Sequence, residues 1–76
     1  MHREPVKSSM MRSIGYDPLL HKVEVEYQNG ALVEYQGVSQ DEWVGFGDAE
    51  SKGKWVQQTL KPGREFRYLG RSEEAK

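Results

Sequence analysis

The chain has 76 residues, of which 36% are hydrophobic and 30% charged, and it contains no cysteine. This length corresponds to one small domain with too many apolar residues for disorder, and disulfide stabilisation is excluded. The two histidines, His2 and His21, have no partners at ligand spacing, so we expect no metal and no cofactor. No apolar run is long enough for a signal peptide or a membrane span, which predicts a cytoplasmic protein without membrane partners.

The formal net charge of −1 hides an uneven distribution of charged residues. Residues 17–50 carry eight acids and one base, whereas residues 51–71 carry six bases and one acid. Either the two halves attract each other within the fold, or the second half presents a basic binding surface. Charge alone does not separate these two interpretations.

The first elements expected in chain order are a lead-in and a strand. Residues 1–5 are predicted to be a flexible lead-in, because Pro5 discourages regular structure. A strand is expected at about 10–16, where larger side chains alternate with smaller ones. Asp17 followed by Pro18 ends it, since a residue before proline is restricted to an extended or turn conformation.

A β-hairpin is predicted next, because residues 22–27 and 31–35 both alternate between apolar and polar side chains. A two-residue turn of Asn29 and Gly30 would place glutamates opposite apolar residues. A three-residue loop, 28–30, instead gathers the apolar residues on one face and the glutamates on the other. We therefore predict the longer loop, with Gly30 at positive φ in a G1 bulge and a solvated acidic outer face.

Two helices should follow the hairpin. The first is expected at about 40–48, where Ser39 and Glu42 can form a capping box. The second should begin after Ser51, a natural N-cap, and end before Pro62-Gly63. Apolar residues recur along both segments at helical spacing, so both helices have a face to bury.

A last strand at about 65–69 and a flexible tail at 71–76 complete the predicted domain, which covers residues 6–70. The predicted fold is of the α+β class: a small antiparallel sheet, order β-β-β-α-α-β, with the helices packed on one sheet face. The predicted core comprises Ile14, Tyr16, Val23, Val25, Tyr27, Val33, Tyr35, Trp43, Phe46, Trp55, Val56, Leu60 and Phe66.

The segment "DAESKGKW" (48–55) is similar at first sight to a phosphate-binding loop. It fails the pattern twice, because Asp48 replaces a glycine and Trp55 replaces a hydroxyl residue. Residues 51–53 could still hold one phosphate at a helix start, although a simple cap with solvated lysines is the favoured explanation. The N-terminal serines have only His21 as a candidate base, so we do not expect an enzyme.

Basic and aromatic residues interleave between residues 52 and 71. Lysine and arginine neutralise phosphates, and exposed aromatic rings stack on unpaired bases. Trp55 and Phe66 lie in apolar patterns and are assigned to the core, which leaves Tyr68 as the stacking candidate. The predicted phosphate contacts are Lys52, Lys54, Lys61, Arg64, Arg67 and Arg71.

An ordered set of short motifs resembles the KTSC domain, named for its place at the C-terminus of some lysyl-tRNA synthetases. The resemblance runs from about Val6 to Tyr68. The chain departs from the family where a Tyr-x-Tyr reads Val33-Glu34-Tyr35, where Ser39 replaces proline, and where Gln57 replaces asparagine. The motifs are Ser8-Ser9, Gly15-Tyr16-Asp17, Asn29-Gly30, Gly37-Val38, and Ala49-x-Ser51-x-Gly53-x-Trp55.

The resemblance implies no established activity, and it suggests RNA binding only through the family's association with a tRNA synthetase. Together with the basic segment, it leads us to expect a non-catalytic module that binds single-stranded RNA or tRNA. The alternative is a protein-interaction or homodimer module, in which the acidic hairpin of one chain faces the basic half of another.

Overall fold

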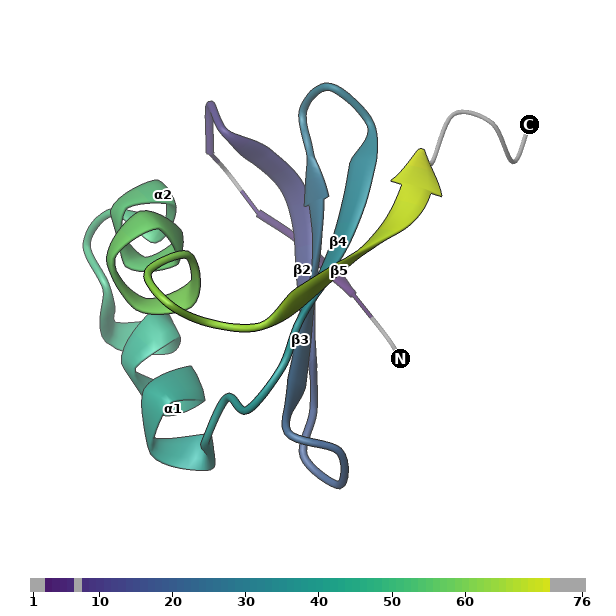
Figure 1. The fold of residues 1–76 in the computed structure, drawn as a ribbon. Helices are drawn as coiled ribbons and strands as arrows, with labels where there is room; N and C mark the ends of the chain where they lie inside the picture. The colour runs from purple at the N-terminus through teal and green to yellow at the C-terminus, as the bar shows by residue number, and fades with distance from the viewer. Residues whose placement is uncertain (1–2, 7, 72–76) are drawn as a thin grey trace.

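A computed structural model describes residues 3–6 and 8–71, and its fold is drawn in Figure 1. One antiparallel sheet contains five strands in the order of the sequence, and two helical segments connect the fourth strand to the fifth. The strands are β1 (Glu4–Pro5), β2 (Met11–Asp17), β3 (Lys22–Tyr27), β4 (Ala31–Tyr35) and β5 (Phe66–Arg71). The helices are α1 (Gln40–Asp48) and α2 (Lys52–Trp55), and α2 continues into the π-helical segment η1 (Val56–Leu60). Figure 1 shows the helices together on one side of the sheet.

The predicted α+β class and the order β-β-β-α-α-β are confirmed. The ends of the chain differ from the prediction. Glu4 and Pro5, assigned to the lead-in, pair with β2 as a two-residue edge strand, a position where proline's missing N–H is tolerated. Arg71, assigned to the tail, ends β5; the other predicted tail residues lie outside the described part of the chain, as do residues 1 and 2.

The hairpin has the predicted three-residue loop. Val25 lies opposite Val33, as only that register allows. Gly30 has a φ of 90°, and its N–H donates to the carbonyl of Tyr27 at 2.9 Å, which closes the turn. The Asn29 side chain accepts a hydrogen bond from the N–H two residues further on, at 3.0 Å. Side-chain parity therefore predicted this turn better than the Asn-Gly dipeptide did.

The outer face of the hairpin is less acidic than its sequence suggests. Arg3 pairs with Glu24 at 3.1 Å, and Lys22 pairs with Glu34 at 3.3 Å. Glu34 is only 8% exposed, which corrects the expectation of a fully solvated face. Burial opposes its ionisation, but hydrogen bonds from Gln36 and Lys22 keep the pKa of Glu34 below its usual value. Much of the acidic charge is thus balanced within the chain.

The first helix begins and ends as predicted, and its capping box is present. The Ser39 hydroxyl accepts from the N–H of Glu42 at 3.2 Å, and the Glu42 carboxylate accepts from the N–H of Ser39 at 3.0 Å. Ser51 caps α2 in the same manner, accepting from the N–H of Lys54 at 3.3 Å. The change to π geometry after Trp55 was not predicted. None of the helices in the described part of the chain is long and apolar enough to cross a membrane.

The core lies between the helices and strands β2 to β4. The rings of Trp43 and Phe46 stack with centroids 5.0 Å apart, and Trp55 meets Phe46 edge-on at the same distance. Most predicted core residues are buried or half-buried, but Phe66 is 63% exposed, so its assignment to the core was wrong. Two buried residues, Met11 and Val38, were not predicted. The fully buried side chains are Met11, Ile14, Val23, Val25, Val38, Val56 and Leu60.

Candidate functional site

The helix-facing side of the sheet continues onto β5, where no described element covers it. Phe66 lies opposite Tyr35 and Tyr68 lies opposite Val33, so both β5 rings point to the side of the sheet that carries the core. They are nevertheless 63% and 56% exposed. Figure 1 shows why, since β5 runs away from α1 and α2 toward the C-terminus.

Two cations border these rings. Lys61 lines a hollow of about 240 Å³ together with Val33, Tyr35 and Phe66. Its ammonium group also lies 5.4 Å from the centroid of the Tyr27 ring. Arg71 lies opposite Ala31, on the same side of the sheet, and its guanidinium donates to the carbonyl of Asn29. We call the surface formed by Val33, Lys61, Phe66, Tyr68 and Arg71 the open face.

Beneath the open face, two tyrosines join the strands of the hairpin. The hydroxyls of Tyr27 and Tyr35 are 2.5 Å apart. Burial, followed by this hydrogen bond, raises the pKa of Tyr27 well above its usual value, so its hydroxyl is protonated at neutral pH. The pair therefore forms a hydrogen-bonded floor beside the exposed rings.

Arg64, one of the predicted phosphate contacts, points into the protein. Its Nη1 donates to the carbonyls of Gln36 and Gly37 at 3.1 and 2.5 Å, and its Nε donates to that of Thr59 at 3.3 Å. Its Nη2 pairs with the Glu42 carboxylate at 2.6 Å, and the side chain is only 15% exposed. Arg64 thereby ties the end of η1 to the segment that follows β4 and to α1.

Two other predicted contacts also lie apart from the open face. The Lys52 ammonium donates to the carbonyls of Phe46 and Gly47 at 2.6 and 3.1 Å, at the end of α1. Arg67 lies opposite Glu34, on the other face of the sheet from Tyr68. The structure thus places Lys61, Tyr68 and Arg71 on the same side of the sheet and separates them from Lys52, Arg64 and Arg67.

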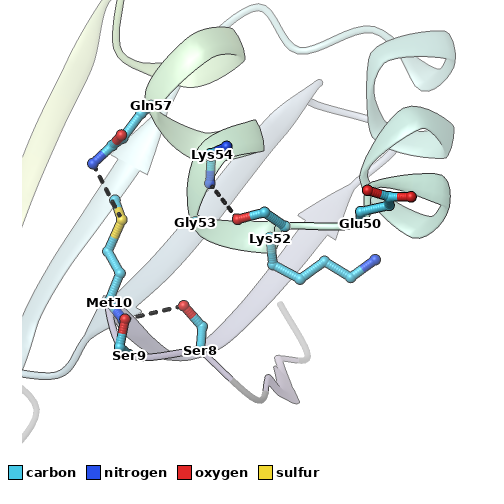
Figure 2. Close-up of a pocket in the computed structure, with 9 residues that line it drawn as sticks. Ser8, Ser9, Met10, Glu50, Lys52, Gly53, Lys54 and Gln57 are labelled. Atoms are coloured by element: carbon cyan, nitrogen blue, oxygen red, sulfur yellow. Dashed lines mark hydrogen bonds between the residues drawn. The ribbon is translucent and has the colours of Figure 1, made fainter.

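The remaining predicted contact, Lys54, lies at a second hollow of about 530 Å³. Figure 2 shows this hollow between the start of α2 and the segment that precedes β2. Its lining unites the paired serines and the Ser-x-Gly motif, which are about 40 residues apart in the sequence. We call it the serine hollow; its residues are Ser8, Ser9, Met10, Glu50, Ser51, Lys52, Gly53, Lys54 and Gln57.

The two walls of the serine hollow lie within van der Waals reach of each other at Gly53. A Cβ there would lie 3.4 Å from the Met10 sulfur and 3.7 Å from the Ser8 hydroxyl. Ser8 and Ser51 each accept a hydrogen bond from a backbone N–H, at 3.1 and 3.3 Å, so each can still donate its own O–H proton. Lys54 is exposed beside them. The hollow therefore offers mainly hydrogen-bond donors at its Lys54 end.

Neither hollow has the geometry of a metal site. Within residues 3–6 and 8–71, no three His, Cys, Asp or Glu side chains come together in a group that would hold a metal ion. Ser13, one of the serines considered as a nucleophile, donates its hydroxyl to the Glu26 carboxylate at 2.9 Å on the outer face of the sheet.

These features describe a small α+β domain with an uncovered aromatic surface, and comparison with known proteins identifies its family. The KTSC domain model matches residues 7–68, so the chain belongs to the KTSC domain family, as its motifs predicted. An uncharacterized protein of Stutzerimonas stutzeri (strain A1501) is 38% identical over 68 residues, which cover 90% of this chain and 94% of that protein. The crystal structure of a KTSC domain protein from Yersinia pestis is 33% identical with a TM-score of 0.85, covering 91% of this chain and 97% of that one. None of these matches indicates a catalytic family.

Sequence reasoning missed Phe66 as a surface residue. The alternation of β5 correctly indicates the face on which Phe66 lies, but it carries no information on whether a helix covers that strand. The sequence feature that could have indicated an uncovered strand was the short length of the two helices. Two segments of nine residues each, about 14 Å long, do not cover a sheet of this width.

Proposed function

We propose that this KTSC domain is a non-catalytic module that binds single-stranded RNA on its open face. The observation that carries the proposal is the pair of exposed rings, Phe66 and Tyr68, on one side of an edge strand between two cations. Residues two apart on a strand are separated by about 7 Å, so each ring can receive one base of a single strand. Lys61 and Arg71 are placed to neutralise the phosphates on either side.

The open face favours unpaired bases over a duplex. In a duplex both faces of each base are already stacked, so the two rings would have no partner there. Loops and ends of tRNA offer the same unpaired bases as free single strands do. The chemistry that we propose to be recognised is therefore a short unpaired stretch, whichever molecule carries it.

The test is a titration of the ¹⁵N-labelled protein with a single-stranded 10-mer RNA at 50 mM and at 200 mM salt. We expect amide shifts in residues 61–71 that weaken as salt rises. Phe66→Ala and Tyr68→Ala should each reduce affinity by about five- to one-hundredfold, because each stacked base contributes roughly 1–3 kcal/mol. Titrations with the matched DNA 10-mer, a hairpin duplex and a tRNA show which kind of molecule supplies the unpaired bases.

Arg67→Gln is the matched control, because it removes one charge from the same strand on the opposite face of the sheet. We expect it to change affinity less than Lys61→Gln does. An absence of amide shifts in residues 51–71 at 50 mM salt would refute RNA binding.

The alternative, a homodimer held by the acidic hairpin against the basic half, has weaker support. The charges that would attract a second chain are partly used within the chain, since Glu24 pairs with Arg3 and Glu34 with Lys22. Sedimentation at low and high salt separates the two hypotheses. Dimers that dissociate as salt rises would favour the alternative, and a monomer at both salt concentrations would favour the open face as a ligand site.

A further inference from the structure

We infer that the RNA site extends from the open face along α2 and η1 into the serine hollow, so that its ligand is a single strand that crosses the sheet. Lys54 and Lys61 would contact successive stretches of its backbone, and Phe66 and Tyr68 would stack its bases. This inference rests on the proposed function. It adds a second subsite, the length of the strand and its direction relative to the β-strands.

One wall of this path is a single face of the second helix. Lys54, Gln57 and Lys61 follow one another at spacings of three and four residues, which places them on the same side. The helix ends in the π turn, where the N–H of Lys61 donates to the carbonyl of Val56, five residues back, at 3.1 Å. Lys54 and Gln57 line the serine hollow, and Lys61 lines the hollow of the open face.

The opposite wall is formed by the start of β2 and the end of β3. The Gln57 amide approaches the Met10 sulfur at 3.9 Å. The N–H of Gln28 donates to the carbonyl of Met10 at 3.1 Å, and its side chain donates to that of Ser8 at 3.0 Å. Tyr27, the residue before Gln28, lies under the Lys61 ammonium. Bonded or stacked neighbours therefore lead without interruption from the serine hollow to the open face.

The residues on this path are accessible to a ligand. Gln28, Gln57 and Lys61 are exposed, and Met10 and Tyr27 are half-buried. Figure 2 places Lys54 and Gln57 on one side of the serine hollow and the Glu50 carboxylate beyond the start of α2. A phosphate at the Lys54 end would thus meet an ammonium group and serine hydroxyls while remaining away from Glu50.

The length of the path sets the length of the strand. Lys54 and Lys61 are separated by about 10 Å along the helix, at 1.5 Å per residue. From Tyr27 on β3 to Tyr68 on β5 there are two strand spacings, again about 10 Å. A stacked strand covers the total of about 20 Å in about six nucleotides, at 3.4 Å per nucleotide, and an extended strand covers it in fewer. An RNA of three nucleotides can occupy the open face without reaching Lys54.

The experiment compares oligouridylates of three, six and ten nucleotides by amide-shift titration at 50 mM salt. We expect all three to shift Phe66 and Tyr68, but only the longer two to shift residues 51–57. Affinity should rise steeply from three to six nucleotides and little further to ten. Lys54→Gln should weaken the 10-mer about three- to tenfold, leave the 3-mer unchanged, and reduce the slope of log affinity against log salt by about 0.7, as expected for one lost phosphate contact.

Arg67→Gln again serves as the charge-matched control. Unlike Lys54→Gln, it should leave unchanged both the dependence of affinity on RNA length and the slope of log affinity against log salt. The extension is overturned, with the proposed function intact, if the 3-mer and the 10-mer bind equally and Lys54→Gln has no effect while Tyr68→Ala abolishes binding. If no oligouridylate shifts any residue, both the proposed function and its extension are overturned.

Discussion

The helix-covered half of the sheet and its open half are built from similar residues but end in opposite environments. In the covered half, Trp43, Phe46 and Trp55 pack ring against ring on β2 and β3. In the open half, Phe66 and Tyr68 alternate along β5 in the same manner, yet more than half of each side chain is exposed. An apolar pattern thus indicates which face a residue occupies, whereas the position of the helices decides whether that face is dry.

Two cations three residues apart differ in the same way. Arg64 donates to three backbone carbonyls and to Glu42, so its charge is satisfied inside the fold. Lys61 lies over the ring of Tyr27 with its ammonium group toward solvent. A planar guanidinium with five donors suits a site built from several carbonyls, whereas an ammonium group remains easily hydrated and available to a ligand. A count of bases in the sequence does not distinguish these two roles.

The largest expected contrast is in stability between the two halves. Leu60 is fully buried, so Leu60→Ala should lower the free energy of unfolding by about 2–5 kcal/mol. Phe66→Ala, in the open half, should lower it by less than about 1 kcal/mol. Urea unfolding followed by tryptophan fluorescence measures both values. Equal losses would show that Phe66 is buried in solution and that the open face does not exist.

The next contrast compares two arginines. Arg64→Gln should cost about 2–3 kcal/mol, because it removes a nearly buried charge with four partners and leaves three carbonyls and one oxygen of the Glu42 carboxylate without their donor. Arg71→Gln, on the exposed end of β5, should cost less than about 1 kcal/mol. Thermal unfolding of the two variants under identical conditions measures both losses of stability. If Arg71→Gln is the more damaging change, Arg71 holds the edge strand in place and is not free to contact a ligand.

The smallest contrast is a dependence of stability on pH, which arises from Glu42 in the covering helix α1. Hydrogen bonding by the Ser39 N–H, and then the charge of Arg64, hold the pKa of Glu42 below its ordinary value of 4.5, against the opposing effect of burial. Because its folded pKa is lowered, Glu42 stabilises the fold above about pH 4.5, and this contribution is lost as pH falls through the lowered value. We expect it to be about 0.5–1 kcal/mol, since the side chain is 35% exposed.

This contribution is measured by urea unfolding of wild type and Glu42→Gln at pH 7 and pH 3. Wild type should be the more stable protein at pH 7, and the difference should shrink at pH 3. Glu50→Gln, a change at an exposed residue of the loop between the helices, should keep the pH dependence of wild type. A difference between wild type and Glu42→Gln that is the same at both pH values would contradict the assignment.

The turn and the helix cap could be predicted from the sequence because the interactions that form them act over a few residues. The parity of side chains selected the three-residue loop and the position of Gly30, and the Ser39–Glu42 spacing located the start of α1. The family motifs were readable in the same way. The pairing of Glu4 and Pro5 with β2 was not, since it depends on contact with another segment of the chain, and no local pattern indicated the π turn of η1.

The candidate site divides along the same line. By itself the sequence determined the fold class, the faces of the strands, and a basic second half in which Tyr68 was the candidate stacking residue. Only the tertiary structure decided that Phe66 joins Tyr68 at the surface, that Arg64 and Lys52 donate to backbone carbonyls, and that Ser8 and Ser51 line one hollow. The physical reason is that alternation and capping are set by neighbours in the chain. The exposure of a side chain depends instead on where the two helices pack, because they are too short to cover the whole width of the sheet.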